Sequence, residues 1–388
     1  MTTVIVDAVR SPIGKFNKSL KDLEVGKMAG QTFQALVERN SGIEKYINEI
    51  MLGVVYQAGA KANPARQAGI FGGLSKSIPS MTINQQCASG MRAITLGNDL
   101  ISAGSADFII AGGAENMSRV PYVLTNARNG YRLGDGHIYD SLFYDGFTDP
   151  FVNYHMGRTA ENVAEMYNIN KEEQNAFSLE SHRKAVEAIE KGKFKNEIIP
   201  LQISDANTFD EDEIPRRDTS LEKLNGLPSV FIKDGTVTAG NSSAIADGSA
   251  AVILTSSEKA ESLNLKKRAV IKSYGMTALD PSIMGLGPIE AIRNALKSAN
   301  LSIDDIEIFE INEAFAAQSL AVIKELSIDR NLVNVNGGAI ALGHPVGSSG
   351  SRIVVTLLHE MERRDLRYGI ASLCVGGGQG LAILLERN

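Results

Sequence analysis

Cys87 is one of only two cysteines in the 388 residues and lies in the segment NQQCASGMR. The segment follows a short apolar run, MTIN, and leads into a helical pattern, so the thiol stands at a helix N-terminus. Unpaired backbone N–H groups and the positive end of the helix dipole favour a thiolate there and lower the pKa of the thiol. We therefore expect Cys87 to be a nucleophile. The alternative is a buried cysteine that packs as a small hydrophobic side chain.

A cysteine nucleophile needs a base or an imidazolium nearby, and the chain has five histidines. His344 is the strongest candidate, because the glycines of NGGAIALGHPVGSSG allow close backbone approach and Pro345 fixes the backbone that follows. A loop histidine without a role is the alternative. His155 in YHMG is a candidate for ligand contact, whereas His182 and His359 are expected on solvated helix faces.

The second cysteine, Cys374, ends a strand-like run and precedes three glycines in SLCVGGGQG. A disulfide with Cys87 is discounted, because two cysteines and no secretory segment fit a reducing compartment. Cys374 is then either an inert buried thiol or a second functional one. In a chain that folds as two related halves, both cysteines could face one cleft between the halves.

Composition excludes several classes of function. The length indicates two or three domains, and 43% hydrophobic with 22% charged residues is ordinary for a soluble globular protein. The 39 basic and 45 acidic residues give a net charge of −6, which argues against nucleic-acid binding. The sequence has no metal-ligand cluster, targeting segment or membrane-spanning run, so we expect a cytoplasmic protein without metal or membrane contact.

Apolar runs of strand length alternate with helical patterns, which indicates layered α/β architecture. Strands are expected at residues 3–9, 49–56, 81–84, 108–115, 251–257, 269–276, 306–312, 370–377 and 381–386. Helices are expected at residues 88–104, 288–300 and 351–364, and between a capping box at Asn170 and a stop at Gly192.

The chain also contains a repeated pattern, in which a small-residue helix start is followed by a helix and a strand with a glycine pair. The matching elements are Ser89-Gly90-x-Arg92 with Ser349-Gly350-x-Arg352, and Gly112-Gly113 with Gly376-Gly377. Order and spacing favour two related halves over chance. Between them, the apolar residues of segment 117–155 follow neither the helical nor the strand spacing, and the segment holds half of the tyrosines. Such a segment is typical of a lid, a binding loop or an oligomer contact. Residues 203–220 are expected to form a charged surface loop.

The sequence resembles the thiolase family along essentially its whole length. The resemblance is carried by NQQCASGMR, GGAENMSR, HMGRTAEN, TAGNSS, INEAFAA, NGGAIALGHPVGSSGSR and CVGGGQG, which stand in thiolase order. It implies two similar βαβαβαββ halves that form a five-layered αβαβα core, with an inserted loop domain. The N-terminal half would comprise residues 1–117 and 247–268, the loop domain residues 118–246, and the C-terminal half residues 269–388.

The resemblance also implies roles for residues at the matching motif positions. Cys87 would be the acylated nucleophile, His344 the residue that activates it, and Cys374 the acid/base that removes a proton from Cα of the second acetyl-CoA. Asn312 would hold a water that forms an oxyanion hole with His344. The backbone N–H groups of Cys87 and Gly376 would form the second oxyanion hole.

Coenzyme A positions follow from the same comparison of motifs. Ser243, His155, Met156 and Phe315 would line the pantetheine tunnel, and Arg216, or its neighbour Arg217, would lie near the nucleotide end. Met156 and Met284 could close the acyl pocket and favour an acetyl group, although ordinary core packing explains methionines equally well.

The resulting hypothesis is an acetyl-CoA C-acetyltransferase that joins two acetyl-CoA to give acetoacetyl-CoA and CoA, or runs the reverse thiolysis. It would need no cofactor and would form a homo-oligomer, a tetramer or a dimer. One alternative is a degradative 3-ketoacyl-CoA thiolase of broader specificity. Others are a decarboxylating condensing enzyme that acts on acyl carrier protein, which the second cysteine disfavours, and a non-catalytic thiolase-like carrier of CoA or lipid.

Overall fold

The N-terminal half of the chain builds one sheet, with the strand order β4-β3-β5-β12-β1. The computed structural model describes residues 1–387. Strand β3 runs parallel to β4 and β5, whereas β12 is antiparallel to β5 and β1. The elements are β1 (Thr3–Arg10), β2 (Gly14–Lys15), α1 (Val25–Arg39), η1 (Ile43–Lys45), β3 (Glu49–Gly53), α2 (Pro64–Phe71), β4 (Ser80–Ile83), α3 (Ser89–Ser102), β5 (Phe108–Asn116), β12 (Ala246–Ser256) and α7 (Ser257–Ser262).

The C-terminal half repeats this topology. Its sheet has the order β14-β15-β16-β13, and a parallel bridge between Val333 and Phe309 stands where the first half has β4. With that bridge counted, strand order and directions match those of the first half. The elements are β13 (Ala269–Ala278), η4 (Pro281–Leu286), α8 (Gly287–Ala299), η5 (Ile303–Asp305), β14 (Ile308–Ile311), α9 (Ala316–Glu325), η6 (Arg330–Leu332), α10 (Ala339–Leu342), α11 (Val346–Arg364), β15 (Tyr368–Val375) and β16 (Gln379–Glu386).

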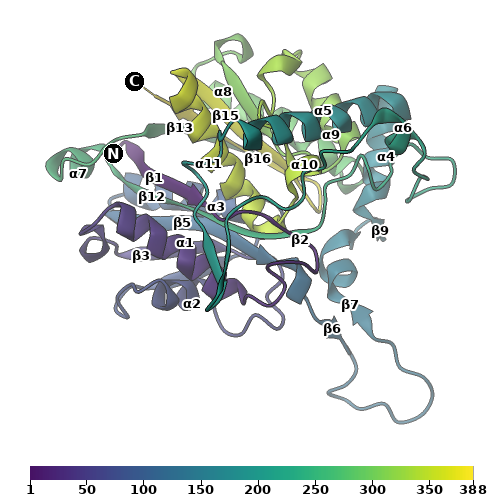
Figure 1. Ribbon diagram of the computed structural model, residues 1–388, viewed down its shortest axis with the longest axis horizontal. Helices are drawn as coiled ribbons and strands as arrows, with labels where there is room; N and C mark the ends of the chain where they lie inside the picture. The colour runs from purple at the N-terminus through teal and green to yellow at the C-terminus, as the bar shows by residue number, and fades with distance from the viewer. Residues whose placement is uncertain (388) are drawn as a thin grey trace.

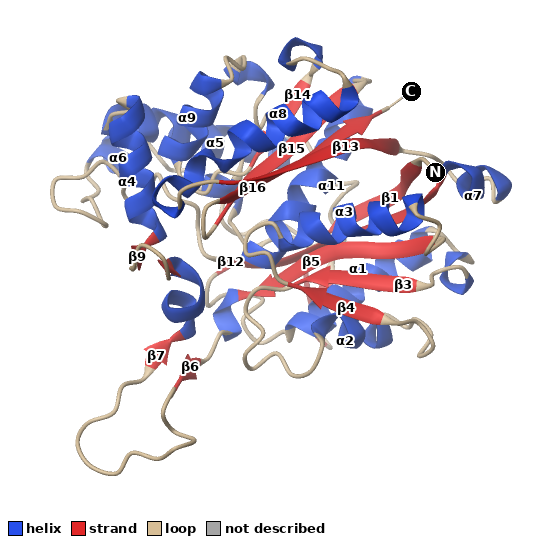
Figure 2. Ribbon diagram, turned by 180° about the vertical axis from the view of Figure 1, so that it is seen from behind, coloured by secondary structure: helices blue, strands red, loops and turns tan. Residues whose placement is uncertain are grey.

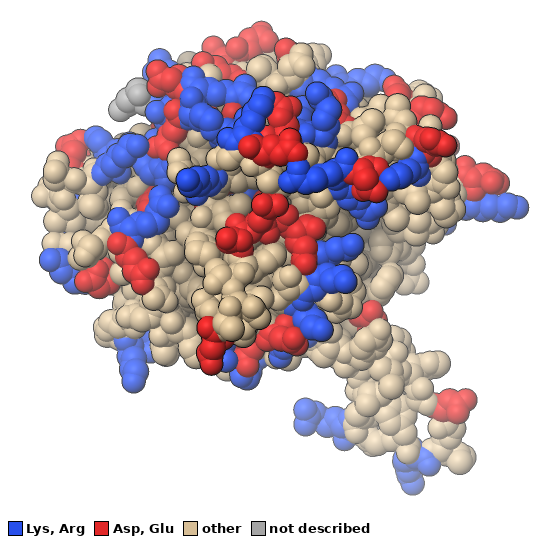
Figure 3. Space-filling model, viewed as in Figure 1, with Lys and Arg blue, Asp and Glu red and all other residues tan. Residues whose placement is uncertain are grey.

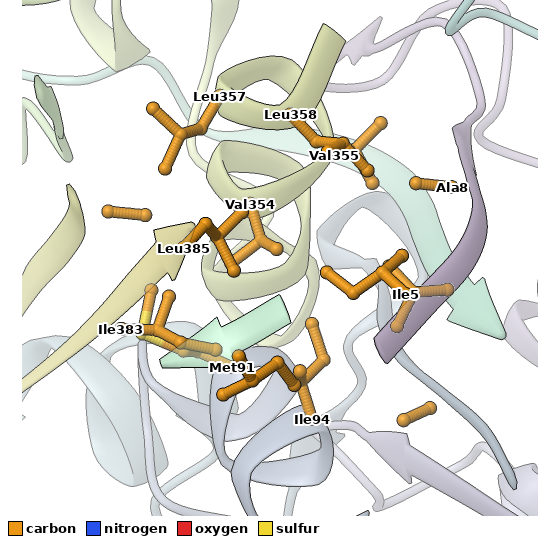
Figure 4. Close-up of a cluster of buried hydrophobic side chains, with 14 of the residues drawn as sticks. Ile5, Ala8, Met91, Ile94, Val354, Val355, Leu357, Leu358, Ile383 and Leu385 are labelled. Carbon is orange, nitrogen blue, oxygen red and sulfur yellow. The ribbon is translucent and has the colours of Figure 1, made fainter. Parts of the chain in front are cut away.

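Five layers result, and they are seen edge-on in Figure 2. Helices α3 and α11 lie between the two sheets, α1 and α2 cover one outer face, and α8 and α9 cover the other. In the described part of the chain, residues 1–387, the strands of the two sheets pair only where β1 meets β13 over two residues. The central layer buries aliphatic side chains from both sheets and both helices, among them Ile5, Met91, Val354 and Ile383 (Figure 4). The expected two halves and five layers are confirmed.

The two central helices touch through the repeated glycines. A Cβ atom at Gly90 would lie 2.8 Å from the carbonyl oxygen of Gly347, and one at Gly350 would lie 2.6 Å from the backbone nitrogen of Met91. A Cβ at Gly113 would clash with the same Gly347 carbonyl. The Ser-Gly-x-Arg pattern is thus repeated because each half supplies one of two helices that must approach backbone to backbone.

An insert connects β5 to β12. A short hairpin of β6 and β7 carries a loop that projects far from the body (Figure 1). Of the remaining elements, α4 and α5 pack over the C-terminal half, whereas the hairpin of β10 and β11 packs against α1 of the N-terminal half. In chain order the insert contains η2 (Met117–Arg119), β6 (Tyr122–Val123), β7 (Tyr139–Asp140), the π-helix η3 (Phe143–Phe147), β8 (Thr148–Asp149), β9 (Tyr154–His155), α4 (Met156–Tyr167), α5 (Lys171–Glu190), β10 (Leu201–Ser204), β11 (Asn207–Phe209) and α6 (Leu221–Asn225).

Three local expectations were wrong. The strand expected at residues 49–56 ends at Gly53, because the N–H groups of Val55 and Tyr56 donate to the buried carboxylate of Glu115 instead of to a strand. His182 and His359 are buried rather than solvated. His182 Nδ1 accepts a hydrogen bond from the N–H of Arg216, and His359 Nε2 lies 3.0 Å from the carbonyl oxygen of Ala8. The helix face that carries His182 and the one that carries His359 are each covered by a segment that is distant in the sequence.

The surface is mixed in charge. On the face shown in Figure 3, basic and acidic side chains are interspersed, and the projecting hairpin is largely uncharged. Across residues 1–387 no helix combines the length and the apolar character that crossing a membrane requires.

A buried ion-pair network fastens the insert to β1. The guanidinium of Arg10 is fully buried and donates to Glu197 at 2.6 Å and to both oxygens of Asp212 at 2.8 Å. Arg10→Met should lower the free energy of unfolding by roughly 3–5 kcal/mol, because two buried carboxylates lose their cation. Urea unfolding followed by circular dichroism measures the change. The control is Lys223→Met, which removes an exposed pair with Asp218 that water and salt screen, and it should leave the free energy of unfolding nearly unchanged; equal losses in both variants would contradict the prediction.

Candidate active site

One cavity of about 500 Å³ collects most of the predicted site residues. It lies where the two halves and the insert meet. Eight of the eleven predicted residues line it: Cys87, His155, Met156, Ser243, Met284, Phe315, His344 and Cys374. Its lining is mostly apolar, and such a setting strengthens the electrostatic effect of the few polar groups present.

The turn after β4 positions Cys87. The Ser89 hydroxyl accepts a hydrogen bond from the N–H of Gln85 and donates to the carbonyl oxygen of Gln86, which closes a tight loop. Gln86 takes the left-handed conformation with φ of 47°. Helix α3 begins at Ser89, so Cys87 immediately precedes the N-cap residue Ala88 as the sequence suggested.

The predicted lowering of the Cys87 pKa is wrong for this state of the protein. Burial raises the pKa of the Cys87 thiol to about 11, and hydrogen bonding by the backbone N–H groups of Gly376 and Cys87 only partly opposes it. Removal from water outweighs the helix N-terminus because the charged form loses its hydration. Cys87 is therefore a thiol at neutral pH. The same two N–H groups converge on its sulfur.

Cys374 is the last residue but one of β15 and is almost fully buried. Burial and the nearby Cys87 raise the pKa of its thiol well above the ordinary value. The turn to β16 needs glycine, because Gly377 and Gly378 have φ of 83° and 78°. A Cβ atom on Gly376 would displace the end of the Met156 side chain, and the backbone N–H of Gly376 donates to the sulfur of Cys87.

Ser349 contacts the imidazole of His344. Nδ1 lies 2.5 Å from the Ser349 hydroxyl oxygen, and the same oxygen lies 3.0 Å from the carbonyl oxygen of Pro345. When the hydroxyl donates to Pro345, Nδ1 carries the proton of the neutral ring and donates to Ser349. Nε2 is then unprotonated. Burial and the charge of Arg352 lower the pKa of His344 to about 3, so the ring is neutral and Nε2 is an acceptor.

Asn312 follows β14 and is fully buried beside His344. Its Nδ2 lies 3.5 Å from His344 Nε2, at the outer limit of a hydrogen bond. Within residues 1–387 its carboxamide oxygen has no hydrogen-bond partner. Asn312 is thus adjacent to the imidazole and has hydrogen-bonding capacity to spare.

A row of aromatic rings forms the wall contributed by the insert. Phe143 contacts Phe147, which contacts His155, which stacks on Phe231 at 4.7 Å, and Phe231 meets Phe315 edge-on. His155 Nδ1 accepts from the N–H of Gly157, so its neutral ring has Nε2–H free to donate. The three phenylalanines of the insert were not predicted as site residues. Phe143 and Phe147 lie in the aperiodic segment 117–155, whose density of aromatic residues was their only signal, and Phe231 lies outside that segment.

Arg216 is not part of the cavity. Its side chain is exposed, and its backbone N–H is bonded to His182. The neighbouring Arg217 forms an exposed ion pair with Glu190. Across residues 1–387, no group of three or more His, Cys, Asp or Glu side chains is arranged to hold a metal ion.

The arrangement can perform acyl transfer and carbon-acid chemistry. A thiol with two N–H groups on its sulfur is suited to forming a thioester and stabilising the oxyanion that precedes it. A neutral imidazole with a free acceptor nitrogen can take the thiol proton. The second thiol, Cys374, faces the same cavity and can exchange a further proton.

Comparisons with known proteins give a consistent result. The family models described as thiolase N-terminal domain and thiolase C-terminal domain match residues 3–258 and 265–387. An acetyl-CoA acetyltransferase of Pseudomonas aeruginosa is 49% identical and one of Chromobacterium violaceum is 48% identical, with at least 99% of each chain covered. A crystal structure of the Bacillus anthracis acetyl-CoA acetyltransferase has a TM-score of 0.97 at 45% identity, and covers 99% of this chain and 98% of that one.

The raised thiol pKa predicts a pH-dependent reactivity. Iodoacetamide should label Cys87 before Cys374, and the rate should rise about tenfold per pH unit from pH 7 to pH 9, because the thiolate fraction grows until the pKa near 11 is reached. Peptide mass spectrometry follows both sites. Free cysteine, with a pKa of about 8.5, should level off in the same range and is the control. A Cys87 rate that is constant above pH 7 would reveal a preformed thiolate and contradict the structure.

Proposed function

Because the chain belongs to the thiolase family, we propose that it is an acetyl-CoA C-acetyltransferase. It joins two acetyl-CoA molecules to give acetoacetyl-CoA and CoA, and catalyses the reverse thiolysis. The observation that carries the proposal is the convergence of Cys87, His344 and Cys374 on one cavity, with two backbone N–H groups on the sulfur of Cys87. Relatives that bear this activity in their names match the chain over its full length.

The first half-reaction acetylates Cys87. His344 Nε2 takes the thiol proton while the sulfur attacks the thioester carbonyl of acetyl-CoA, and the N–H groups of Cys87 and Gly376 stabilise the oxyanion. When the tetrahedral intermediate collapses, the departing CoA thiolate takes the proton of Cys374. The acetyl-enzyme then contains an imidazolium at His344 and a thiolate at Cys374.

The second half-reaction uses that pair of charges. The Cys374 thiolate removes a Cα proton from a second acetyl-CoA, and the enolate oxygen is stabilised by His344 Nε2–H and a water held by Asn312. The enolate carbon attacks the acetyl group on Cys87 and forms the new carbon–carbon bond. Cys87 leaves as a thiolate and regains its proton from His344, so all three groups return to their neutral resting forms.

Binding of the CoA moiety follows the cavity. His155, Met156, Ser243 and Phe315 would contact pantetheine, and Arg216 would lie at the nucleotide end outside the cavity. The reaction as written needs no cofactor. We also propose a homo-oligomer, tetramer or dimer, since the projecting hairpin leaves Tyr122, Leu133 and Ile138 exposed.

Two other functions fit less well. A degradative 3-ketoacyl-CoA thiolase would use the same residues with a wider acyl pocket, and rates with longer substrates decide between the two. A non-catalytic CoA or lipid carrier would not need two thiols and a tautomer-fixed imidazole in one cavity.

The two cysteines should fail at different steps. Cys374→Ser should still acquire an acetyl group on Cys87 from acetyl-CoA, although more slowly than the wild type. Acyl transfer removes no proton from carbon, and the CoA thiolate, a good leaving group, can take its proton from water instead of from Cys374. Its condensation rate should fall by about 10²–10⁴, since a hydroxyl is a far weaker base than a thiolate. Cys87→Ser should fail at the first step. Intact-protein mass spectrometry measures acetylation, and deuterium entry from solvent into the acetyl methyl group measures proton removal.

Wild-type protein assayed with acetoacetyl-CoA and CoA is the reference for both variants. Near-wild-type condensation by Cys374→Ser would make Cys374 structural and remove the proposed mechanism. A wild type that neither acetylates Cys87 nor cleaves acetoacetyl-CoA would favour the carrier function.

Ser349 should be needed to hold His344 in its tautomer. Ser349→Ala leaves Nδ1–H without its acceptor, and kcat should fall roughly tenfold to hundredfold, the cost of one unpaired buried donor, with KM little changed. Ser351→Ala on the same helix is the control, because that hydroxyl bonds only to the carbonyl oxygen of Ser348. Nitrogen NMR of His344 should show mixed tautomers in the Ser349 variant alone. Equal kcat in both variants would show that Ser349 does not fix the ring.

A further inference from the structure

The active cavity has two apolar walls, one beside each cysteine. Met284 and Phe315 form a buried cluster with Cys374, and Met156 packs against it; we term this the Cys374 wall. Tyr56 and Val346 form a separate buried cluster, against which Cys87 and Phe147 pack; we term this the Cys87 wall. All of these side chains line the cavity. The two walls therefore face different parts of any substrate that reacts with both thiols.

The chemistry of the proposed function, on which this inference rests, assigns one part of the substrate to each wall. Thiolysis of a 3-ketoacyl-CoA breaks the C2–C3 bond. C3, with the rest of the acyl chain, becomes bonded to the sulfur of Cys87, whose proton passes to His344. The electron pair of the broken bond stays on C2, which takes the proton of Cys374 and leaves as acetyl-CoA. The chain beyond C3 therefore extends from Cys87, and a substituent on C2 lies beside Cys374.

Tyr56 is the fixed part of the Cys87 wall. Its backbone N–H donates to Glu115 at 3.2 Å, and its hydroxyl donates to the carbonyl oxygen of Leu142 at 3.0 Å. Glu115 is buried and also accepts from the N–H of Gly347, so the backbone of Tyr56 is anchored to the start of α11. A Cβ on Gly146 would clash with the hydroxyl, which shows how closely the π-helix packs on the ring. Held at both ends, the ring cannot swing aside for a longer chain.

We infer that Tyr56 limits the length of the acyl chain that Cys87 can carry, whereas Met284 limits substituents at C2. The sequence analysis expected Met156 and Met284 to restrict the acyl group. Their place beside Cys374 puts them against the carbon that loses its proton. Chain length and C2 branching are thus controlled by different residues, and each can be changed without the other.

Substitutions in the two walls test this division. Tyr56→Ala should raise kcat/KM for 3-ketooctanoyl-CoA relative to acetoacetyl-CoA by about tenfold or more, since even one methylene that a pocket rejects commonly costs tenfold. Tyr56→Phe keeps the ring and should leave the ratio within about threefold of wild type. Met284→Ala should leave that ratio unchanged and raise kcat/KM for 2-methylacetoacetyl-CoA. Octanoylation of Cys87 by octanoyl-CoA, read by mass, should increase in Tyr56→Ala only.

The reverse pattern, in which Met284→Ala admits the long chain and Tyr56→Ala does not, would overturn the inference. An unchanged ratio in a folded Tyr56→Ala that still cleaves acetoacetyl-CoA would also overturn it, while leaving the proposed function standing. Tyr56→Leu replaces the alanine variant if that variant does not fold, with the same expected direction. Failure of the wild type to cleave acetoacetyl-CoA would reject the proposed function itself.

Discussion

The backbone contact between α3 and α11 is the constraint on which the site depends. Each helix presents a glycine, Gly90 or Gly350, to the backbone of the other helix, and any side chain there would force the two apart. Cys87 lies just before one of these helices and His344 just before the other. Because the helix starts meet at the centre of the molecule, the proposed nucleophile and its proposed base open into one cavity although 257 positions separate them in the sequence. Because the helices approach so closely, the site is also buried.

Burial makes the resting site neutral throughout. The pKa of the Cys87 thiol is raised to about 11, that of Cys374 is raised further, and that of His344 is lowered to about 3. A charge formed alone in such a cavity is unfavourable. The proposed mechanism avoids that by moving two protons in each half-reaction, so that an imidazolium and a thiolate arise together and disappear together. The high pKa values are therefore compatible with catalysis, because neither thiol has to ionise by itself.

The sequence was a good guide wherever a signal was local or repeated. The repeated small-residue helix starts and glycine pairs indicated two halves, and most of the predicted site residues line one cavity because each lies in a short motif at an element boundary. Properties that arise only on folding were missed. The sign of the Cys87 pKa shift depends on burial by the other half, and His182 and His359 are covered by segments far away in the chain. The phenylalanines of the insert lie in a segment without periodicity, so nothing in the sequence indicated which way their rings face.

The difference between the two halves lies mainly in one connection. In the C-terminal half, strands β15 and β16 are joined by the short turn at Gly376, whose N–H reaches Cys87. In the N-terminal half the equivalent strands, β5 and β12, are joined by the whole insert. The insert therefore starts and ends at the place where its counterpart is a tight turn, and it brings His155 and Phe231 to the cavity. The short connection supplies the N–H group proposed as an oxyanion donor, and the long connection supplies side chains of the cavity wall. A symmetric scaffold thereby acquires a site that distinguishes the acyl group on Cys87 from the carbon acid beside Cys374.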